Sequence, residues 1–446
     1  MNYLLKGGRV VDPSQQLDSC PLDILVERGV IVKLEDNIAK TGAAGRRAKS
    51  GDLQVFNLEG MVVAPGLIDM HTHLREPGFE YKETIRTGSE AAVASGFTSI
   101  ACMPNTNPVN DNRAVTEFIK RKAQECGLVR VYPVATITVG SEGAHLAEFA
   151  DLKDAGAVAF SDDGKPVMNA GIMRRALEYA ASIGMPVISH CEDLNLSAGG
   201  LMNEGWTATK LGLPGIPGIA EDIMVARDIA LAGFTGTPVH IAHVSTKEAV
   251  SLIRNAKTRG IGVTAETAPH YFSLTDEFLE EFDTNGKVNP PLRTPDDLQA
   301  IKEGLWDGTI DAIASDHAPH GRTDKEVEFE YASAGISGLE TSLALGLRLV
   351  EEGALTLTQL IEKMSIMPAK ILKIPGGTLR VGSVADITAF DPGMAWTVAL
   401  PLFRSRGKNS PFGGWALRGK AVLTLVNGEV KYRNPLPLDG GGLGWG

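Results

Sequence analysis

Two histidines separated by one residue, His71 and His73, close an apolar stretch of the chain, MVVAPGLIDMHTHL. Side chains two residues apart on a β-strand point to the same side. If the stretch is a strand, both imidazoles leave its end side by side, and paired neutral imidazoles are good ligands for a divalent metal. An HxH pair alone is a weak signal, because a strand that simply ends in polar residues is the more common explanation. The other strand ends must therefore decide between the two interpretations.

Potential metal ligands also end several other apolar runs. Asp162 and Asp163 lie in AVAFSDDG, His190 in PVISHCE, His243 in PVHIAHVS, and Asp316 in DAIASDHAPH. If these runs are parallel strands of one barrel, their carboxyl ends meet at a common face. The sequence therefore predicts a buried group of His and Asp ligands of the kind that binds zinc.

The elements that would position these side chains alternate regularly between residues 58 and 375. The eight strand-like runs are VVAPGLIDMHTH, TSIACMPNT, VRVYPVATIT, AVAFSDDG, PVISHCE, PVHIAHVS, IGVTAETAPH and DAIASDHAPH. The helix-like segments between them are 82–94, 113–125, 170–182, 221–232, 247–257 and 295–305. Strands that alternate with helices pair in parallel, and eight such units predict an α/β fold of the (β/α)₈ TIM-barrel type. A doubly wound sheet is the alternative, but no GxGxxG turn follows the first strand.

Both ends of the chain have a different sequence pattern, in which Gly, Pro and Asp separate short runs rich in β-branched residues. We expect residues 1–57 and 376–446 to join in one small β-sandwich domain beside the barrel domain at 58–375. Asn427-Gly428 between two apolar runs predicts a hairpin. The stretch 40–51 is typical of a linker, and GGGLGWG of a flexible tail.

Composition excludes several classes of protein. The 446 residues carry 43 basic and 54 acidic side chains, a formal net charge of −11, so we expect no nucleic-acid partner and no anionic membrane surface. The four cysteines form no CxxC pair, which argues against a disulfide framework. No run of about 18 apolar residues and no signal-peptide pattern occurs, so we expect a cytoplasmic protein.

The order of these ligands resembles that of the amidohydrolase superfamily, whose barrels hold one or two divalent metals. Within it, the blocks HTHLREPG, MPNTNP, FSDDGKPV, ISHCED, IAHVST, KVNPPLR and ASDHAPH are similar to those of the long-chain (class I) bacterial dihydroorotases, over essentially the whole chain. Hydantoinase-like relatives bridge two metals with a carboxylated lysine at the end of strand four. This chain has SDDGK there, which matches the aspartate-bridged dihydroorotases instead.

The resemblance implies two Zn²⁺ ions per subunit. His71 and His73 would bind the first ion, His190 and His243 the second, and Asp163 would bridge them. The number of ions, one or two, stays open from the sequence.

Two further assignments concern carboxylates. Asp162 is the alternative bridging residue, because the strand register is uncertain by one position, and Lys165 is a more remote option. The resemblance implies that Asp316 binds the first metal and carries the proton during catalysis.

The resemblance also implies a pocket for an anionic substrate. Arg75 lies two residues after His73, on the same side by alternation, and a guanidinium binds a carboxylate in a bidentate fork. The other substrate-binding positions would be His73, Asn105, Asn289, His320 and the backbone of Ala334 and Gly335. The segment 321–337 is charged and flanked by glycine, and is a candidate lid.

The implied activity is the reversible cyclisation of N-carbamoyl-L-aspartate to (S)-dihydroorotate plus water in de novo pyrimidine biosynthesis, through zinc-activated hydroxide. A homodimer and a complex with aspartate transcarbamoylase would be the expected assemblies. The alternatives are another cyclic amidase of the hydantoinase or allantoinase kind, and a catalytically silent structural partner of aspartate transcarbamoylase. The second alternative is disfavoured because such proteins lose metal ligands, and this chain keeps them all.

Overall fold

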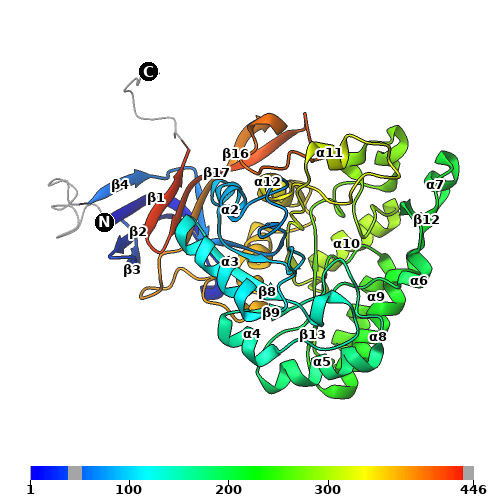
Figure 1. The fold of residues 1–446 in the computed structure, drawn as a ribbon. Helices are drawn as coiled ribbons and strands as arrows, with labels where there is room; N and C mark the ends of the chain where they lie inside the picture. The colour runs from blue at the N-terminus through cyan, green and yellow to red at the C-terminus, as the bar shows by residue number, and fades with distance from the viewer. Residues whose placement is uncertain (1, 39–52, 435–446) are drawn as a thin grey trace.

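The structure of the chain, a computed structural model, describes residues 2–38 and 53–434 (Figure 1). The predicted linker at 40–51 and the GGGLGWG tail lie outside the described residues. Among the described residues, no helix is long and apolar enough to cross a membrane.

Eight parallel strands form the predicted barrel. They are β6 (Leu67–Thr72), β7 (Phe97–Cys102), β8 (Arg130–Ala135), β9 (Ala159–Phe160), β10 (Ile188–Ser189), β13 (Val239–Ile241), β14 (Val263–Thr267) and β15 (Ala312–Ile313). They pair in two rows, β6-β7-β8-β9 and β10-β13-β14-β15. Single parallel bridges, from Phe160 to Val187 and from Thr72 to His317, join the rows into a closed ring. The prediction of a (β/α)₈ barrel is confirmed, and the carboxyl ends of all eight strands open on one face.

Helices connect the strands and cover the outside of the barrel (Figure 1). The main helices are α2 (Ile85–Ala94), α3 (Arg113–Cys126), α4 (Phe149–Ala155), α5 (Ala170–Ser182), α8 (Ile219–Thr235), α9 (Lys247–Thr258), α10 (Pro295–Asp307) and α12 (Leu339–Glu351). Local sequence explains their ends. The side chain of Asn112 accepts a hydrogen bond from the Val115 N–H to begin α3, and Gly127 ends it at a φ of 63°.

Shorter elements occupy the longer loops. They are α6 (Leu194–Ser197), β11 (Met202–Asn203), α7 (Trp206–Leu211), β12 (Gly215–Ile216), α11 (Arg322–Lys325), α13 (Leu357–Ile361) and α14 (Met367–Leu372). The first four lie between β10 and α8, and α11 follows β15 inside the predicted lid segment. The segment between β10 and α8 and the segment after β15 both begin at the carboxyl end of a barrel strand, where loops can border a site.

One sequence prediction of a strand is wrong. The run VVAPGLIDMHTH is two strands: β5 (Val62–Pro65) belongs to the terminal sheet, and β6 belongs to the barrel. Gly66 separates them, and a Cβ there would lie 2.2 Å from Thr98 Oγ1 of the neighbouring strand. A continuous apolar run does not reveal this division, because both halves are buried.

Strands from both ends of the chain form one eight-stranded sheet beside the barrel, which confirms that the termini build a common β-unit. Its strands are β1 (Asn2–Asp12), β2 (Leu17–Glu27), β3 (Val30–Glu35), β4 (Gln54–Asn57), β5, β16 (Ile387–Thr397), β17 (Ala416–Val426) and β18 (Glu429–Arg433). The N-terminal and C-terminal strands meet where β5 pairs with both β1 and β16. Asn427 and Gly428 both have positive φ and make the predicted hairpin turn between β17 and β18.

A large apolar cluster joins the barrel, its helices and part of the terminal sheet, and smaller clusters lie within each unit. Apolar side chains from the barrel strands, among them Met70, Ala101, Val134 and Ala159, form one of these smaller clusters inside the barrel. The terminal sheet has its own cluster, which includes Leu5, Ile24 and other residues from both chain ends. The barrel face that carries the ligands is therefore fixed by a packed interior below it.

Candidate metal centre and substrate pocket

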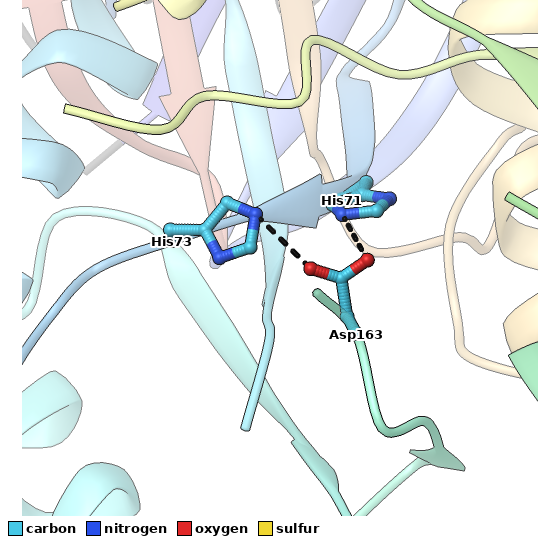
Figure 2. Close-up of side chains that lie close together, drawn as sticks. All are labelled: His71, His73 and Asp163. Atoms are coloured by element: carbon cyan, nitrogen blue, oxygen red, sulfur yellow. Dashed lines mark ion pairs between the residues drawn. The ribbon is translucent and has the colours of Figure 1, made fainter. Parts of the chain in front are cut away.

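The Asp163 carboxylate lies between the two histidines of the HxH pair (Figure 2). Its Oδ1 is 3.3 Å from His71 Nε2, and its Oδ2 is 3.5 Å from His73 Nε2. All three side chains are buried. They come from the ends of two strands, β6 and β9, and form one group whose ligand atoms could hold a metal ion.

A second group shares the same carboxylate. Asp163 Oδ1 lies 3.7 Å from His190 Nδ1, after β10, and 3.4 Å from His243 Nε2, after β13. The two histidine nitrogens lie 2.8 Å apart. Asp163 with His190 and His243 is thus a second set of ligand atoms for a metal ion. A carboxylate shared between two pairs of histidines is the arrangement that the family resemblance implied.

Outer partners determine which nitrogen of each histidine is available. His71 Nδ1 lies 2.6 Å from Glu266 Oε1, and His73 Nδ1 lies 2.8 Å from Asn105 Oδ1. A ring nitrogen that donates to such an acceptor leaves the other nitrogen as a lone pair for a metal. Both Nε2 atoms therefore turn a lone pair towards Asp163.

His190 has the opposite arrangement. Its Nε2 lies 3.1 Å from Glu192 Oε2, so Nδ1 is the nitrogen that turns to Asp163. The same Glu192 oxygen accepts a hydrogen bond from Asn289 Nδ2 at 2.8 Å. One carboxylate thus orients both a predicted ligand and a predicted substrate-binding residue.

The residues present fit a divalent metal. His71 Nε2 and Asp163 Oδ1 are buried atoms with no hydrogen-bond partner among the described residues. Buried polar atoms are normally satisfied, so an unsatisfied lone pair beside an unsatisfied carboxylate oxygen indicates a cation site. Imidazole nitrogen and carboxylate oxygen are also the donors that zinc takes in catalytic sites.

The charges in the cluster agree with this interpretation. Burial alone would raise the pKa of Asp163, but His71 and the neighbouring histidines hold that pKa well below its usual value. Burial lowers the pKa of His190, but Asp163 and Glu192 outweigh burial and raise it to about 9. The carboxylates therefore attract positive charge to this position, whether that charge is a proton or a metal ion.

The alternative bridging residues lie elsewhere. The Asp162 carboxylate accepts hydrogen bonds from the backbone N–H groups of Ile137 and Thr138, at 2.8 and 3.0 Å, and from the Thr138 hydroxyl. Lys165 is exposed. Of the three residues considered from the sequence, Asp163 is the one that the fold brings to the histidines.

Asp316 lies at the edge of the first group. Its Oδ1 is 3.2 Å from His73 Nε2 and 3.6 Å from His71 Nε2. The backbone has a φ of 46° there, in a region that non-glycine residues rarely adopt. Burial alone would raise the pKa of Asp316, but His73 and the other histidines lower it, so the carboxylate is ionised at neutral pH.

The predicted carboxylate-binding residues lie close together, but Arg75 arrives by a different route from the one predicted. β6 ends at Thr72, so alternation does not continue to Arg75; a φ of 62° at Arg75 turns the chain instead. Its Nη2 lies 3.4 Å from His320 Nε2, and its Nε donates to the Pro319 carbonyl at 3.3 Å. Asn105 joins this side of the site through His73.

The segment 321–337 packs against the loop that carries Asn289. The Gly335 N–H donates to the Lys287 carbonyl at 2.9 Å, and the Gly335 carbonyl accepts from Asn409 Nδ2 at 2.9 Å. The Ala334 carbonyl lies 2.9 Å from His320 Nε2. Three of the four backbone N–H and C=O groups of Ala334 and Gly335 thus have protein partners. Contact of this backbone with a substrate ring stays a prediction.

Sequence reasoning missed three residues that shape the site. Glu266 orients His71, Glu192 orients His190, and Asn409 anchors His320, whose backbone N–H donates to Asn409 Oδ1 at 2.8 Å. Glu192 stands two residues after the predicted ligand His190 in ISHCED and could have been noticed there. Asn409 follows β16, 89 residues beyond His320, and no sequence pattern links the two.

Comparisons with known proteins agree with these features. Residues 60–249 match a family model described as dihydro-orotase-like. The chain is 62% identical to a protein named dihydroorotase from Syntrophus aciditrophicus (strain SB), covering 97% of this chain and all of the relative. It is 58% identical to a dihydroorotase from Geobacter metallireducens, with the same coverage. Among solved structures, an L-hydantoinase (dihydropyrimidinase) from Arthrobacter aurescens superposes with a TM-score of 0.85 at 28% identity, covering 96% of this chain and 95% of that one.

Proposed function

Because the chain belongs to the dihydroorotase family, we propose that it interconverts N-carbamoyl-L-aspartate and (S)-dihydroorotate, with loss or uptake of water, in pyrimidine biosynthesis. The observation that carries this proposal is the position of Arg75 and His320 beside the two histidine groups that share Asp163. A cation next to a metal centre suits a cyclic amide that also carries a carboxylate.

The proposed cofactor is Zn²⁺, two ions per subunit, held by His71, His73, His190 and His243 with Asp163 between them. Bound metal would activate water for attack and polarise the amide carbonyl of the ring. The donor set of four imidazoles and a shared carboxylate supports this choice.

Asp316 is the proposed proton carrier. Its carboxylate is ionised and lies beside the first histidine pair, so it can accept a proton from the attacking water and deliver it to the leaving ring nitrogen. In the direction of cyclisation the same carboxyl group starts protonated and helps water leave. Because Asp316 stands at the edge of the cluster, four histidines and Asp163 remain when it is replaced.

Substrate binding is assigned to residues on the same face. Arg75, Asn105 and His320 are proposed to bind the carboxylate, with His73 adjacent, while Asn289 and the backbone of Ala334 and Gly335 hold the ring. The Asn289 side chain is already oriented by Glu192, which supports a fixed rather than a mobile contact.

The two alternative functions differ from this one in specific ways. A hydantoinase or allantoinase would act on rings without this carboxylate, and identity to the L-hydantoinase is 28% against 62% to a dihydroorotase. A silent structural partner of aspartate transcarbamoylase would lack the metal ligands, whereas all six ligand residues are present and the histidines face Asp163. An active enzyme can still form a complex with aspartate transcarbamoylase. We propose a cytoplasmic homodimer, to be tested by sedimentation with and without that partner.

The deciding experiment measures metal content and turnover on the same purified protein. Turnover of dihydroorotate that a chelator abolishes and Zn²⁺ restores is expected. Replacement of Asp316 by Asn should keep the metal and lower kcat by about 10²- to 10⁴-fold, because the base is removed while the four histidines and Asp163 remain as ligands. Activity on hydantoin but not on dihydroorotate would contradict the assignment, and normal turnover of Asp316→Asn would contradict the role of that residue.

A further inference from the structure

His320 is held between two cationic side chains. Its Nδ1 lies 3.2 Å from Lys82 Nζ, and its Nε2 lies 2.9 Å from the Ala334 carbonyl and 3.4 Å from Arg75 Nη2. The imidazole is buried. Lys82 comes from the loop before α2, eleven residues after the HxH pair begins, and the proposed function gives it no role.

These contacts determine the protonation of His320. An ammonium group has hydrogens but no lone pair, so Nδ1 must be the unprotonated nitrogen that accepts from Lys82. Nε2 then carries the hydrogen and donates it to Ala334. Protonation of Nδ1 would place two cationic donors against each other, and burial together with Arg75 and Lys82 lowers the pKa of His320 to about 2.

A consequence follows for Arg75. Since Nε2 of His320 carries a hydrogen, it cannot accept a hydrogen bond from Arg75 Nη2. Among the described residues, the one acceptor within hydrogen-bond distance of the guanidinium is then the Pro319 carbonyl, at 3.3 Å. Most of its donors are left for an anion, although the group is partly buried.

The carboxylates near these cations already have other partners: Asp316 and Asp163 lie against the histidines, and Asp324 Oδ2 lies 3.9 Å from His320 Nδ1. The carboxylate nearest to Lys82 is Asp324, whose Oδ2 lies 3.6 Å from Nζ and also accepts the Gly321 N–H. Asp324 Oδ1 accepts from the Tyr81 hydroxyl at 3.3 Å. Arg75 is attracted by Asp316 and Asp163 as well as by Asp324, whereas the carboxylate that pairs with Lys82 is Asp324, which already has other donors. The Lys82 side chain is 14% exposed.

We propose that Lys82 is a positioning and specificity residue for the substrate carboxylate. It fixes His320 as the neutral form with the hydrogen on Nε2, and it supplies a second positive charge behind Arg75. This inference rests on the proposed function. It predicts that Lys82 contributes to binding of the anionic substrate and not to the chemical step.

The test compares Lys82→Met with Lys82→Arg, using dihydroorotate as substrate and orotate as a competitive inhibitor. Loss of a charged donor in a partly buried pocket is expected to raise KM and the inhibition constant about 10- to 100-fold, with kcat within about 3-fold. Lys82→Arg keeps the charge and the donor and is expected to restore most of the affinity. Lys247→Met is the matched control, because Lys247 is an exposed lysine whose ammonium pairs with Asp296.

A second variant tests whether Lys82 acts on substrate binding or only holds the segment that carries Asp324 in place. Asp324→Asn removes the anion beside Lys82 but leaves both cations, so KM should stay the same or fall. If Asp324→Asn raised KM as much as Lys82→Met, the pair would act only by tethering the segment, and the proposal would be overturned. Unchanged KM and orotate inhibition in Lys82→Met would overturn it as well. Wild-type protein without dihydroorotate turnover would instead reject the proposed function itself.

Discussion

Replacement of Asp163 by Asn tests the centre of the proposed site with a minimal change. The substitution keeps the size and shape of the side chain and removes one negative charge. In the structure this carboxylate faces four histidine nitrogens at 3.3, 3.5, 3.7 and 3.4 Å, and it belongs to both groups of ligand atoms. A single substitution therefore reduces both groups from three ligand residues to two.

The expected magnitude follows from this sharing. An outer partner of a metal-binding histidine is worth about 10- to 100-fold in metal affinity, and a direct ligand is worth more. We therefore expect Asp163→Asn to weaken metal binding by at least ~100-fold and to abolish measurable turnover after dialysis.

The assay is metal analysis by mass spectrometry, with dihydroorotate turnover measured on the same samples. Asp162→Asn is the matched control, since it makes the same change one residue away in a carboxylate that binds Ile137 and Thr138 instead. The control is expected to keep its metal. Wild-type metal content in Asp163→Asn, or equal loss in both variants, would refute the assignment of Asp163 as the shared ligand.

Three further predictions concern metal, substrate and pH. Removal of the metal by a chelator should lower Tm by about 4 °C if the metal is present at ~1,000 times its Kd, as calorimetry would show; an unchanged Tm would argue against a bound metal in the folded state. Arg75→Lys keeps the charge but loses the bidentate fork, so KM should rise about 10-fold with little change in kcat, and an unaltered KM would remove Arg75 from the pocket. Burial and the neighbouring Lys287 lower the pKa of Lys325 to about 7, below its value in the unfolded chain. Between pH 7 and 10 the unfolded state therefore binds more protons than the folded state, and folding stability should rise with pH in this range. Between pH 7 and 9, the free energy of unfolding measured with urea should rise by about 2 kcal/mol more in the wild type than in Lys325→Met. The same dependence of this free energy on pH in both proteins would contradict the prediction.

The parts of the fold and site that the sequence predicts are those with a local signature. The eight runs that contain the barrel strands, the helix-like segments between them and the Asn427-Gly428 hairpin each depend on residues within a few positions of one another. The histidines were found for the same reason, because each one ends a strand and the barrel geometry brings strand ends together.

The parts that could not be predicted depend on contacts between distant segments. The orientation of Arg75 depends on a backbone turn after β6, which alternation does not anticipate. Glu266 looks like one more acidic residue in a strand until the barrel closes and places it against His71, 195 residues away. The choice between Asp162 and Asp163 required the Ile137 and Thr138 backbone, since the two aspartates are equivalent in sequence.

The position of Asn409 has a consequence for how an active molecule is made. Its side-chain amide accepts a hydrogen bond from the His320 N–H and donates one to the Gly335 carbonyl. Its backbone carbonyl accepts a hydrogen bond from the Ser337 N–H. A ribosome that has made the last barrel strand has therefore not yet made the residue that secures the loop after it. The substrate pocket can therefore be completed only after β16 has been made, so catalytic competence should arrive late in synthesis.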